Sequence, residues 1–506
     1  MLRPDRSPRA TLADAARQVP GARLAGGPAG AGGGLLGGVT LSSAEVRPGD
    51  LFAALPGAKT HGARHAGAAL AAGAAAVLTD PAGEALLPPA TPRLVVADPR
   101  ARLGPLAAWL YGYPARRLKL VGVTGTNGKT TVAHLLESAL ARRYAKVALL
   151  GTVLARVDGR ELASERTTLE APALQAALAA MAERGVEACV MEVSSHALAL
   201  HRVDGLVFDV AAFTNLTRDH LDFHGAMGDY FAAKAALFTP GRARLGVIGL
   251  ADGWSRQLAR TSQIERLTVS REPADQPDWL VAPGPPARDG TAFELVRRAG
   301  PARPLAAAVR LPGAYNVDNA AVALVSAIAA GVAPKAAAAG VRQAAPVPGR
   351  MERVAAPPGA PQVVVDYAHA PASVAAALAA LRPHTPGRLI AVLGAGGERD
   401  HGKREAMGAA AAQGADLVYV TDDNPRGEDP AAIRAAVLAG AGAQAREVAS
   451  RAGAIGQAIK AAEGQDTVVI LGKGHEAAID YGGQLRPHQD NLVAGAALRA
   501  RMEDAG

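Results

Sequence analysis

The sequence predicts an α/β protein of three domains, and three observations carry this prediction. A glycine-rich turn at residues 124–131 (T-G-T-N-G-K-T-T) separates a strand-like segment from a helix-like one. Short apolar runs alternate with helical patterns from about residue 115 to about residue 345, and again from there to the C-terminus. A chain of 506 residues also exceeds one ordinary domain, because domains hold about 100–200 residues each.

The glycine-rich turn has the composition of a phosphate-binding loop. Residues 118–123 are apolar and β-branched, as in a buried parallel strand, and the apolar residues of 132–140 share one face of a helix. The N–H groups of such a loop surround a phosphate, Lys129 neutralises it, and the Thr130 hydroxyl reaches Mg²⁺. The general pattern G-x-x-x-x-G-K-T is incomplete here, because Val123 stands at the first glycine. A glycine turn that binds nothing therefore stays an alternative.

Composition favours a globular protein that binds small anions. Charged residues make up 20% and apolar residues 49%, and the formal net charge is +8. Nucleic acid is not an expected partner, because aromatic residues are only 4% and no long Lys/Arg run is interleaved with them. The first residues lack the basic-then-apolar order of a signal peptide, and the longest apolar stretch is shorter than the ~18 residues of a membrane span. We therefore expect a soluble, cytoplasmic protein without membrane insertion.

The chain has a single cysteine, Cys189. One cysteine excludes an intrachain disulfide. It lies in the apolar run A-C-V-M-E-V, where a cysteine is expected to act as a small core residue. The same expected burial argues against a catalytic Cys–His pair.

Two short linkers divide the chain into the predicted domains. One is Gly112-Tyr113-Pro114, and the other is Pro346-Val347-Pro348-Gly349. They set the expected domains at residues 1–113, 114–345 and 346–506.

Apolar runs predict the strands of the two larger domains. In the middle domain these are residues 188–193, 207–213 and 245–250, and residues 272–310 are expected to add a small antiparallel excursion. In the last domain they are residues 363–365, 389–393, 417–420 and 468–471, separated by helical patterns. Ligands of such doubly wound sheets bind at the C-terminal ends of the strands, and polar residues gather there in this sequence. In the first domain, residues 63–73 predict a helix.

Two ionisable residues of the middle domain have more than one interpretation. Glu192 ends the strand-like run C-V-M, where a carboxylate can hold Mg²⁺, although a helix-capping acid is the alternative. Lys234 lies in the apolar helical segment Y-F-A-A-K-A-A-L-F. The residues alone favour a lysine whose stem packs while its ammonium reaches solvent.

Five motifs, in this order, resemble those of the Mur ligase family, the ATP-dependent amide ligases of peptidoglycan precursor synthesis. They are T-G-T-N-G-K-T-T at 124–131, M-E-V-S-S-H at 191–196, T-N-L-T-R-D-H at 214–220, Y-x-x-A-K at 230–234 and G-x-Y-N-V-x-N-A at 313–320. The resemblance implies a UDP-binding N-domain, a central P-loop ATPase-like α/β domain and a Rossmann-like C-terminal domain.

The resemblance also implies ATP, Mg²⁺ and a set of catalytic residues. The expected ATP-binding residues are Gly125, Thr126, Asn127, Gly128, Lys129, Thr130, Thr131, Asn316, Asn319, Arg350 and Asp366. Mg²⁺ would be held by Thr130, Glu192 and Lys234, the last carrying a CO₂-derived carbamate, and the catalytic residues would be Lys129, His220 and Lys234. Only a neutral amine reacts with CO₂, so burial would have to lower the pKa of Lys234 from about 10.4.

The C-terminal domain is expected to select the incoming amino acid. The run Asp423-Asn424-Pro425-Arg426 is similar to the signature of family members that add meso-2,6-diaminopimelate. Diaminopimelate differs from lysine by a carboxylate at its far end, and an arginine fork matches a carboxylate. The residues expected at this amino acid are Arg399, Asp423, Asn424, Pro425, Arg426, Gly472 and Glu476.

The N-terminal domain resembles the family less closely. The family's D-S-R appears here as Ser42-Ser43-Ala44. The residues expected to contact UDP-MurNAc-L-Ala-D-Glu are Leu41, Ser43, Ala58, Lys59, Thr60, Thr167, Thr168, Ser194 and Arg202.

Together these features predict an ATP-dependent ligase that joins meso-diaminopimelate to UDP-MurNAc-L-Ala-D-Glu through an acyl phosphate. A Mur ligase that adds lysine is the nearest alternative. Folylpolyglutamate and cyanophycin synthetases share the ATP loop but lack the D-N-P-R run with its partners. A nucleotide-binding regulator or an inactive scaffold is the alternative outside the enzymes.

Overall fold

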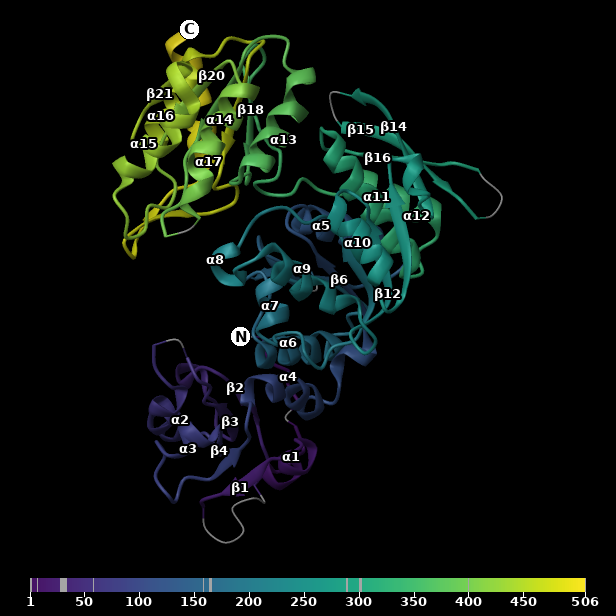
Figure 1. Ribbon diagram of the computed structural model, residues 1–506, viewed down its shortest axis with the longest axis vertical. Coiled ribbons are helices and arrows are strands. Elements are labelled where there is room, and N and C mark those ends of the chain that lie inside the picture. Colours follow the sequence, from purple (N-terminus) through teal and green to yellow (C-terminus); the bar gives the residue numbers. More distant parts are fainter. Residues whose placement is uncertain are drawn as a thin grey trace.

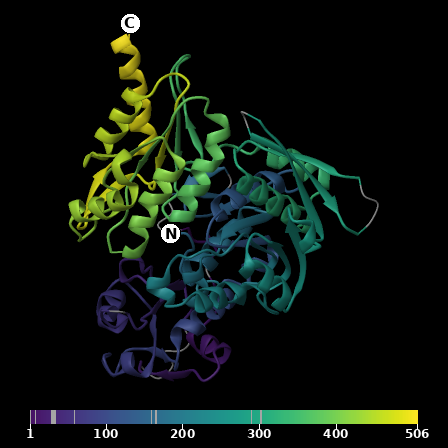
Figure 2. The same cartoon turned by 45° about the horizontal axis from the view of Figure 1, so that its top comes forward.

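The computed structural model describes residues 2–6, 8–27, 34–57, 59–157, 159–162, 166–287, 290–299, 303–398 and 400–505. The N-terminal domain (purple) and the C-terminal domain (yellow-green) lie at opposite ends of the long axis, and the C-terminal domain lies beside the part of the central domain that holds β14 (Trp279–Ala287), β15 (Gly290–Arg297) and β16 (Leu305–Val309) (Figures 1 and 2). Each domain is built around its own sheet, which confirms the predicted α/β class. The predicted boundaries fall between these sheets, and their positions stay a prediction. No helix among the described residues is long and apolar enough to cross a membrane.

The N-terminal sheet has the strand order β1-β5-β4-β3-β2, with β1 antiparallel and the other strands parallel. Its strands are β1 Arg23–Ala25, β2 Gly38–Thr40, β3 Asp50–Ala53, β4 Ala76–Thr79 and β5 Arg93–Val95. Its helices are α1 Leu12–Gln18, α2 Ala66–Ala71, α3 Pro81–Glu84 and α4 Pro99–Leu110. The helix predicted at residues 63–73 is shorter than expected. The His61 ring accepts a hydrogen bond from the Ala63 N–H and starts a 3₁₀ turn, and Gly73, at φ 99°, lies beyond the helix end.

The N-terminal residues, for which the sequence suggested no role, contact both the N-terminal domain and the central domain. The Arg3 guanidinium donates to both carboxylate oxygens of Asp50 at 2.8 Å, and both side chains are buried. The Glu183 carboxylate accepts from the backbone N–H groups of Asp5 (2.7 Å) and Arg6 (3.2 Å). Glu183 belongs to the central domain, so this segment links two domains.

The central domain holds the longest sheet, with the order β16-β15-β14-β13-β12-β11-β6-β10-β7-β8-β9. Its strands are β6 Lys119–Thr124, β7 Val147–Leu150, β8 Ala155–Val157, β9 Arg160–Leu162, β10 Ala188–Glu192, β11 Phe208–Phe213, β12 Ala243–Gly249, β13 Glu265–Ser270, β14 Trp279–Ala287, β15 Gly290–Arg297 and β16 Leu305–Val309. The predicted antiparallel excursion is confirmed, because β14, β15 and β16 pair antiparallel and extend the sheet.

Helices cover both faces of this sheet. They are α5 Lys129–Leu140, α6 Ala171–Glu183, α7 Ser195–Ala199, α8 Leu221–His224, α9 Met227–Ala235, α10 Gly253–Thr261, α11 Ala314–Ala329 and α12 Pro334–Gln343. Strand β6 lies between β10 and β11 and is parallel to both. The phosphate loop, Glu192 and Thr214 therefore emerge at one edge of the sheet, because the C-terminal ends of neighbouring parallel strands meet there.

The buried position of Cys189 is confirmed. It lies on β10 with no exposed surface, and burial raises the pKa of its thiol to about 12. The thiolate is the reactive form, so the folded protein is expected to resist thiol reagents. Incubation with a maleimide at pH 7.5 should leave the native chain unlabelled and modify one site after unfolding in guanidinium. Rapid native labelling would contradict the buried assignment.

The C-terminal sheet has the order β17-β18-β22-β19-β20-β21, and only β17 is antiparallel among the described strands of this sheet. Its strands are β17 Glu352–Val354, β18 Gln362–Asp366, β19 Leu389–Leu393, β20 Leu417–Val420, β21 Ala445–Glu447 and β22 Thr467–Leu471, and a hairpin of β23 Ala478–Tyr481 and β24 Gln484–Pro487 follows. The helices are α13 Pro371–Leu381, α14 Arg404–Gly414, α15 Pro430–Ala441, α16 Arg451–Ala461 and α17 Asp490–Ala505. Helices α13, α14 and α15 pack on one face and α16 and α17 on the other, as in the predicted doubly wound layout.

Candidate active site

The phosphate loop joins β6 to α5 and is held open by hydrogen bonds to the loop after β11. The Asn127 N–H donates to the Asn215 side-chain carbonyl at 3.0 Å, and the Thr126 N–H donates to the Asn215 backbone carbonyl at 2.9 Å. Gly125 and Gly128 have φ angles of 144° and 85°. A Cβ on Gly125 would lie 1.9 Å from the Thr214 hydroxyl, so the close approach of the two loops requires glycine.

Glu192 ends β10 and lies directly against the start of α5. The Thr130 hydroxyl donates to its two carboxylate oxygens at 3.1 and 3.0 Å, and Thr152 donates from its N–H (2.8 Å) and its hydroxyl (3.0 Å). The carboxylate is 1% exposed. Glu192 is therefore an anchored carboxylate at the phosphate loop, and the helix-capping alternative does not describe its contacts.

Lys129 and Lys234 meet at the same backbone carbonyl. The Lys129 ammonium donates to the Gly125 carbonyl at 3.0 Å, and Lys234 Nζ reaches it at 2.7 Å from α9. Lys234 is 1% exposed, so the interpretation of a lysine whose ammonium reaches solvent is wrong. Burial, reinforced by the positive charge of Lys129, holds the pKa of Lys234 well below its ordinary value. Two ammonium groups that contact the same carbonyl repel one another, and this repulsion favours a neutral amine at Lys234.

His220 occupies the N-cap position of the short helix α8 in a left-handed backbone conformation, at φ 53°. Its ring lies 5.0 Å from that of His196 and 6.2 Å from that of Tyr230, measured between centroids. Burial, with the nearby Lys129 charge, lowers the pKa of His220 to about 4. His220 is therefore neutral at pH 7, and its ring can donate one hydrogen bond and accept another without adding charge to the site.

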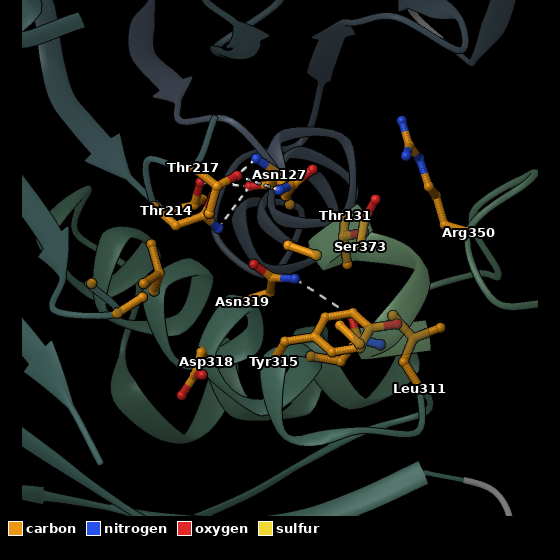
Figure 3. Close-up of a pocket in the computed structure, with 18 of the residues that line it drawn as sticks. Asn127, Thr131, Thr214, Thr217, Leu311, Tyr315, Asp318, Asn319, Arg350 and Ser373 are labelled. Atoms are coloured by element: carbon orange, nitrogen blue, oxygen red, sulfur yellow. Dashed lines mark hydrogen bonds between the residues drawn. The ribbon is translucent and has the colours of Figure 1, made fainter. Parts of the chain in front are cut away.

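A cavity of about 390 Å³ lies between the central and C-terminal domains (Figure 3). The central domain contributes Asn127, Gly128, Thr131, Tyr315, Asn316 and Asn319, and the C-terminal domain contributes Arg350, Asp366, Tyr367, His369 and Ser373. Seven of the eleven residues predicted to bind ATP thus line one cavity from two domains, whereas Gly125, Thr126, Lys129 and Thr130 are not among its lining residues. This cavity is called the nucleotide cavity below.

Arg350 bridges the two walls of the nucleotide cavity. Its guanidinium donates to the Thr130 hydroxyl at 3.3 Å and stacks over the Tyr367 ring at 4.5 Å. Asp366 accepts from the N–H groups of Met351 (2.8 Å) and Ala368 (2.9 Å). Burial raises the pKa of Asp366, and the Arg350 charge opposes that rise.

A smaller cavity of about 130 Å³ lies where the loops after β18, β20 and β22 face the central domain. Its walls include Asp423, Asn424, Arg426, Gly472 and Glu476, all predicted to bind the incoming amino acid, together with His220 and Asp219. Tyr367 and His369 line this cavity as well as the nucleotide cavity. It is called the amine cavity below.

Polar contacts hold two charged residues that line the amine cavity, Glu476 and Arg426. Asn424 Nδ2 donates to Glu476 at 2.8 Å, and the Lys473 ammonium donates to the same carboxylate oxygen at 2.7 Å. Burial alone would raise the pKa of Glu476, but Lys473 and Asn424 outweigh it and the pKa is lowered. Arg426, at φ 52°, donates to the Gly397 carbonyl at 2.6 Å. The cavity thus offers an anion at Glu476 and a cation at Arg426.

A third cavity, of about 620 Å³, lies between the N-terminal and central domains. Leu41 and Thr167 line it, as do Leu2, Arg166 and Glu170. Of the other residues predicted to contact the UDP precursor, Ser43 starts a 3₁₀ turn next to Leu41, while Lys59 and Thr60 lie exposed on a separate loop. The structure therefore gathers only part of the predicted set at this precursor cavity.

Thr168, Ser194 and Arg202 connect the precursor cavity to Glu192. The Thr168 hydroxyl donates to the Glu192 backbone carbonyl at 2.9 Å and accepts from the Ser194 N–H at 3.1 Å. Arg202 forms an ion pair with Glu170 at 2.9 Å. The precursor cavity is thereby joined to the phosphate loop through a short chain of hydrogen bonds.

Two predicted residues, Ala58 and Arg399, lie outside the described residues. Other residues of the site were not predicted, namely Thr152, Asn215, Thr217, Tyr367, His369 and Lys473. Lys473 and His369 stand in the polar runs G-K-G-H-E and D-Y-A-H at strand ends, and that position could have singled them out. Thr152 carries no local signal, because its role depends on pairing with Glu192 forty residues away.

Three family descriptions match this chain in succession. The Mur ligase family catalytic domain matches residues 36–111, the Mur ligase middle domain matches 123–327, and the Mur ligase glutamate ligase domain matches 349–474. A protein of Streptomyces coelicolor named UDP-N-acetylmuramoyl-L-alanyl-D-glutamate–2,6-diaminopimelate ligase is 49% identical over 91% of this chain and 92% of its own length. The chain belongs to the Mur ligase family.

Further comparisons agree with this Mur ligase assignment. A relative from Leifsonia xyli, 44% identical over 91% of both chains, is named UDP-N-acetylmuramyl-tripeptide synthetase, a name that leaves the amino acid open. A solved structure named as a UDP-N-acetylmuramoyl-L-alanyl-D-glutamate–2,6-diaminopimelate ligase is 33% identical, with a TM-score of 0.65 over 92% of this chain and 96% of that one. A MurF ligase from Thermotoga maritima in complex with ADP shares the fold at 18% identity, with a TM-score of 0.66 over 92% of this chain and 98% of that one.

The residues around the phosphate loop of this Mur ligase fit Mg²⁺ in part. The Thr130 hydroxyl and the Glu192 carboxylate are hard oxygen donors already in contact with one another, and Mg²⁺ prefers such ligands together with phosphate and water. An amine at Lys234 does not suit this ion, whereas a carbamate there would. Among the residues that the structure describes, no three His, Cys, Asp or Glu side chains gather into a ready-made metal site.

Proposed function

We propose that this Mur ligase is an ATP-dependent amide ligase of peptidoglycan precursor synthesis in the cytoplasm. It joins meso-2,6-diaminopimelate to the D-glutamyl carboxylate of UDP-N-acetylmuramoyl-L-alanyl-D-glutamate through an acyl phosphate. One observation carries the proposal: the amine cavity, lined by both Glu476 and Arg426, shares Tyr367 and His369 with the nucleotide cavity. The identity to named diaminopimelate ligases over most of the chain supports the same activity.

ATP binds in the nucleotide cavity, with its phosphates along the loop and Lys129. Its γ-phosphoryl group is transferred to the D-glutamyl carboxylate, which turns an inert anion into an acyl phosphate with a good leaving group. Lys129 and Arg350 offset the repulsion between these anions, and this is catalysis by positioning and electrostatics. Because Arg350 and Asp366 close the cavity from the C-terminal domain, they also keep water from the acyl phosphate.

Thr130, Glu192 and a carbamate on Lys234 would hold Mg²⁺ in this enzyme. When bound, the ion supplies Lewis-acid neutralisation of the phosphate oxygens. The protein's own part is to keep Lys234 neutral, because a buried amine beside Lys129 can add CO₂ with loss of one proton. The product is an anion that balances the charge of Lys129.

Diaminopimelate enters the amine cavity and its distal end is bound through two charges of opposite sign. Glu476, kept ionised by Lys473, would pair with the distal ammonium, and Arg426 would pair with the distal carboxylate. The other amine then attacks the acyl phosphate, an N–C bond forms, the C–O bond to phosphate breaks, and the amine proton is lost. His220, a neutral wall of this cavity, lies where the two substrates would meet.

The precursor cavity between the N-terminal and central domains would bind the UDP-linked dipeptide. Leu41, Ser43 and Thr167 would contact it there, and Thr168, Ser194 and Arg202 would direct its D-glutamyl end toward Glu192 and the phosphate loop. Lys59, Thr60 and Ala58 are proposed contacts of the uridine diphosphate. Arg399 is proposed as a second cation for the amino acid.

An assay of phosphate release tests this function. The purified protein, with ATP, Mg²⁺ and UDP-MurNAc-L-Ala-D-Glu, should release phosphate only when meso-diaminopimelate is added. L-Lysine at the same concentration should give less than about one hundredth of that rate, because it leaves Arg426 unpaired. Equal rates with both amines would favour the lysine-adding alternative. Phosphate release with folate or glutamate chains, or none with any amine, would contradict the proposal.

A further inference from the structure

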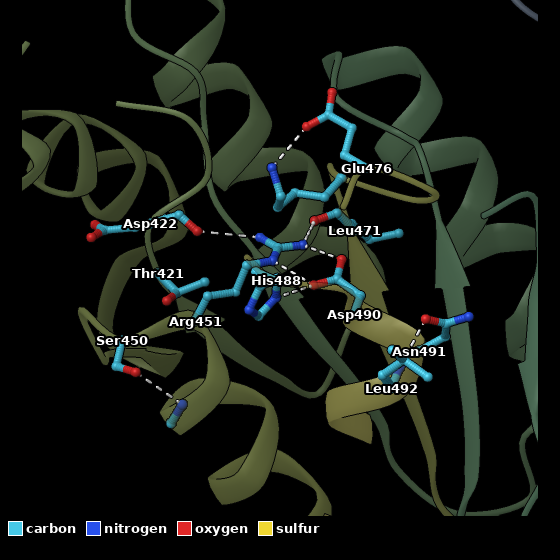
Figure 4. Close-up of polar contacts among 12 residues, drawn as sticks. Thr421, Asp422, Ser450, Arg451, Leu471, Glu476, His488, Asp490, Asn491 and Leu492 are labelled. Carbon is cyan, nitrogen blue, oxygen red and sulfur yellow. Dashed lines mark hydrogen bonds and ion pairs between the residues drawn. The ribbon is translucent and has the colours of Figure 1, made fainter. Parts of the chain in front are cut away.

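A buried ion pair lies behind the loops that line the amine cavity, and neither of its residues is among the lining residues. Arg451 begins α16 and Asp490 begins α17, and both side chains have no exposed surface. Arg451 Nε and Nη2 donate to the two oxygens of Asp490, each at 2.7 Å, and His488 lies 2.8 Å from the same carboxylate (Figure 4). The Asp490 carboxylate, which also has His488 as a partner, therefore fixes the orientation of the Arg451 guanidinium.

The remaining N–H groups of Arg451 bind the two loops that carry the amine-binding residues. Nη2 donates to the carbonyl of Leu471, the last residue of β22, at 2.9 Å. Nη1 donates to the carbonyl of Asp422, just after β20, at 3.3 Å. The next residues along the chain are Gly472 and Asp423, which line the amine cavity. One side chain thus ties together two strand ends that lie far apart in the sequence.

A second buried cation continues this connection to the cavity surface. Lys473, with no exposed surface, donates to Asn424 Oδ1 at 2.9 Å and to Glu476 at 2.7 Å. The loops also touch directly, because a Cβ on Gly472 would lie 2.5 Å from the Asp423 carboxylate. The positions of Asn424 and Glu476 therefore depend on the relative placement of the two loops, which Arg451 sets.

We propose that Arg451, held by Asp490, is a positioning residue for the incoming amino acid. It keeps the loops after β20 and β22 in register, so that Glu476 and Arg426 are spaced for the two charges at the far end of the substrate. A buried ion pair is a poor source of stability, since desolvation offsets much of its attraction. Holding two loops at a fixed separation is a role that an apolar pair could not fill. This inference rests on the proposed ligase function.

Arg451→Lys tests the proposal, because lysine keeps the charge but has a single nitrogen in place of the three that bind Asp490 and the two carbonyls. Steady-state kinetics of the full-length variant should give a KM for diaminopimelate at least tenfold higher, with the KM for ATP within twofold. The preference for diaminopimelate over lysine should fall by a similar factor.

Arg388→Lys is the matched control. Arg388 precedes β19 at the opposite end of the same sheet, where it grips Asp466 through Nε (3.1 Å) and Nη2 (2.7 Å) and donates to the Ala461 carbonyl at 2.8 Å. This side chain is more exposed, but it has the same kind of contacts far from the amine cavity. Its replacement should leave both KM values within twofold.

His488→Ala covers the case in which Arg451→Lys does not fold. This change removes one hydrogen bond to Asp490 and should raise the KM for diaminopimelate two- to fivefold. An unchanged KM in folded Arg451→Lys, or in His488→Ala if the first variant is unfolded, overturns the inference, as does an equal rise in the KM for ATP. A wild-type protein without diaminopimelate-dependent phosphate release would instead overturn the proposed function itself.

Discussion

Replacement of Lys234 by alanine is expected to lower kcat by about a thousandfold, the scale of losing a charged group at a phosphoryl-transfer site. The side chain is buried beside Lys129, and its pKa is lowered, so it supplies a neutral amine that can become an anionic carbamate. In the proposed mechanism, the variant lacks the metal-holding carbamate, which Thr130 and Glu192 do not replace. Steady-state phosphate release measures the effect.

Three further experiments distinguish a carbamate on Lys234 from a positively charged Lys234 side chain. Acetate or formate should restore part of the activity of Lys234→Ala, since a small carboxylate can fill the space that the proposed carbamate would occupy. Lys234→Arg should stay inactive and should not respond to acetate, because a guanidinium keeps the positive charge and forms no carbamate. Lys335→Ala, an exposed lysine on α12, should behave as wild type. Activity retained in Lys234→Arg would show that activity depends on a positive charge at this position and not on a carbamate.

Replacement of Arg426 by alanine should raise the KM for diaminopimelate by about 30- to 150-fold, which corresponds to about 2–3 kcal/mol for a lost buried charge pair. The KM for ATP should change less than twofold, because Arg426 lines the amine cavity and not the nucleotide cavity. The weak rate with lysine should stay nearly constant, since lysine has no distal carboxylate for Arg426 to bind. The variant would thus lose most of its preference for diaminopimelate over lysine while its rate with lysine stayed nearly the same.

Arg486→Ala is the control for this measurement. Arg486 belongs to the same domain and stacks over Tyr481 at 4.5 Å, but it is exposed on β24 and lines neither cavity. Its loss should leave the amino acid kinetics intact. Equal increases in the KM values for ATP and diaminopimelate in Arg426→Ala would mean that the residue supports the domain as a whole and selects nothing.

Local sequence predicted the parts of this site that depend on neighbouring residues. The phosphate loop is a strand, a glycine turn and a helix within about twenty residues, and Glu192 follows an apolar strand directly. The strand-end position of Asp423 to Arg426 likewise follows from the β/α alternation of the C-terminal domain. Such features are set by hydrophobic period and turn chemistry, which a single sequence contains.

The features that the sequence did not predict depend on contacts between distant segments. Lys234 looked like a solvent-reaching lysine because the carbonyl that receives it, at Gly125, is 109 residues away. Arg451 and Asp490 are 39 residues apart and each resembles an ordinary helix-end charge. The Arg3–Asp50 pair, in a segment with no apparent motif, depends on how the N-terminus folds back. Burial of a charge is a property of the assembled fold, so local pattern does not report it.

The two-domain origin of the nucleotide cavity has a thermodynamic consequence. Arg350 and Asp366 would bind ATP from one domain and the phosphate loop from the other. ATP binding and the angle between the domains are then linked, and each changes the other by the same free energy. A covalent cross-link that held the two domains together would then slow the release of bound nucleotide, ADP included. Release of the product, rather than bond formation, would then limit the rate. The affinity for nucleotide would report the angle between the two domains.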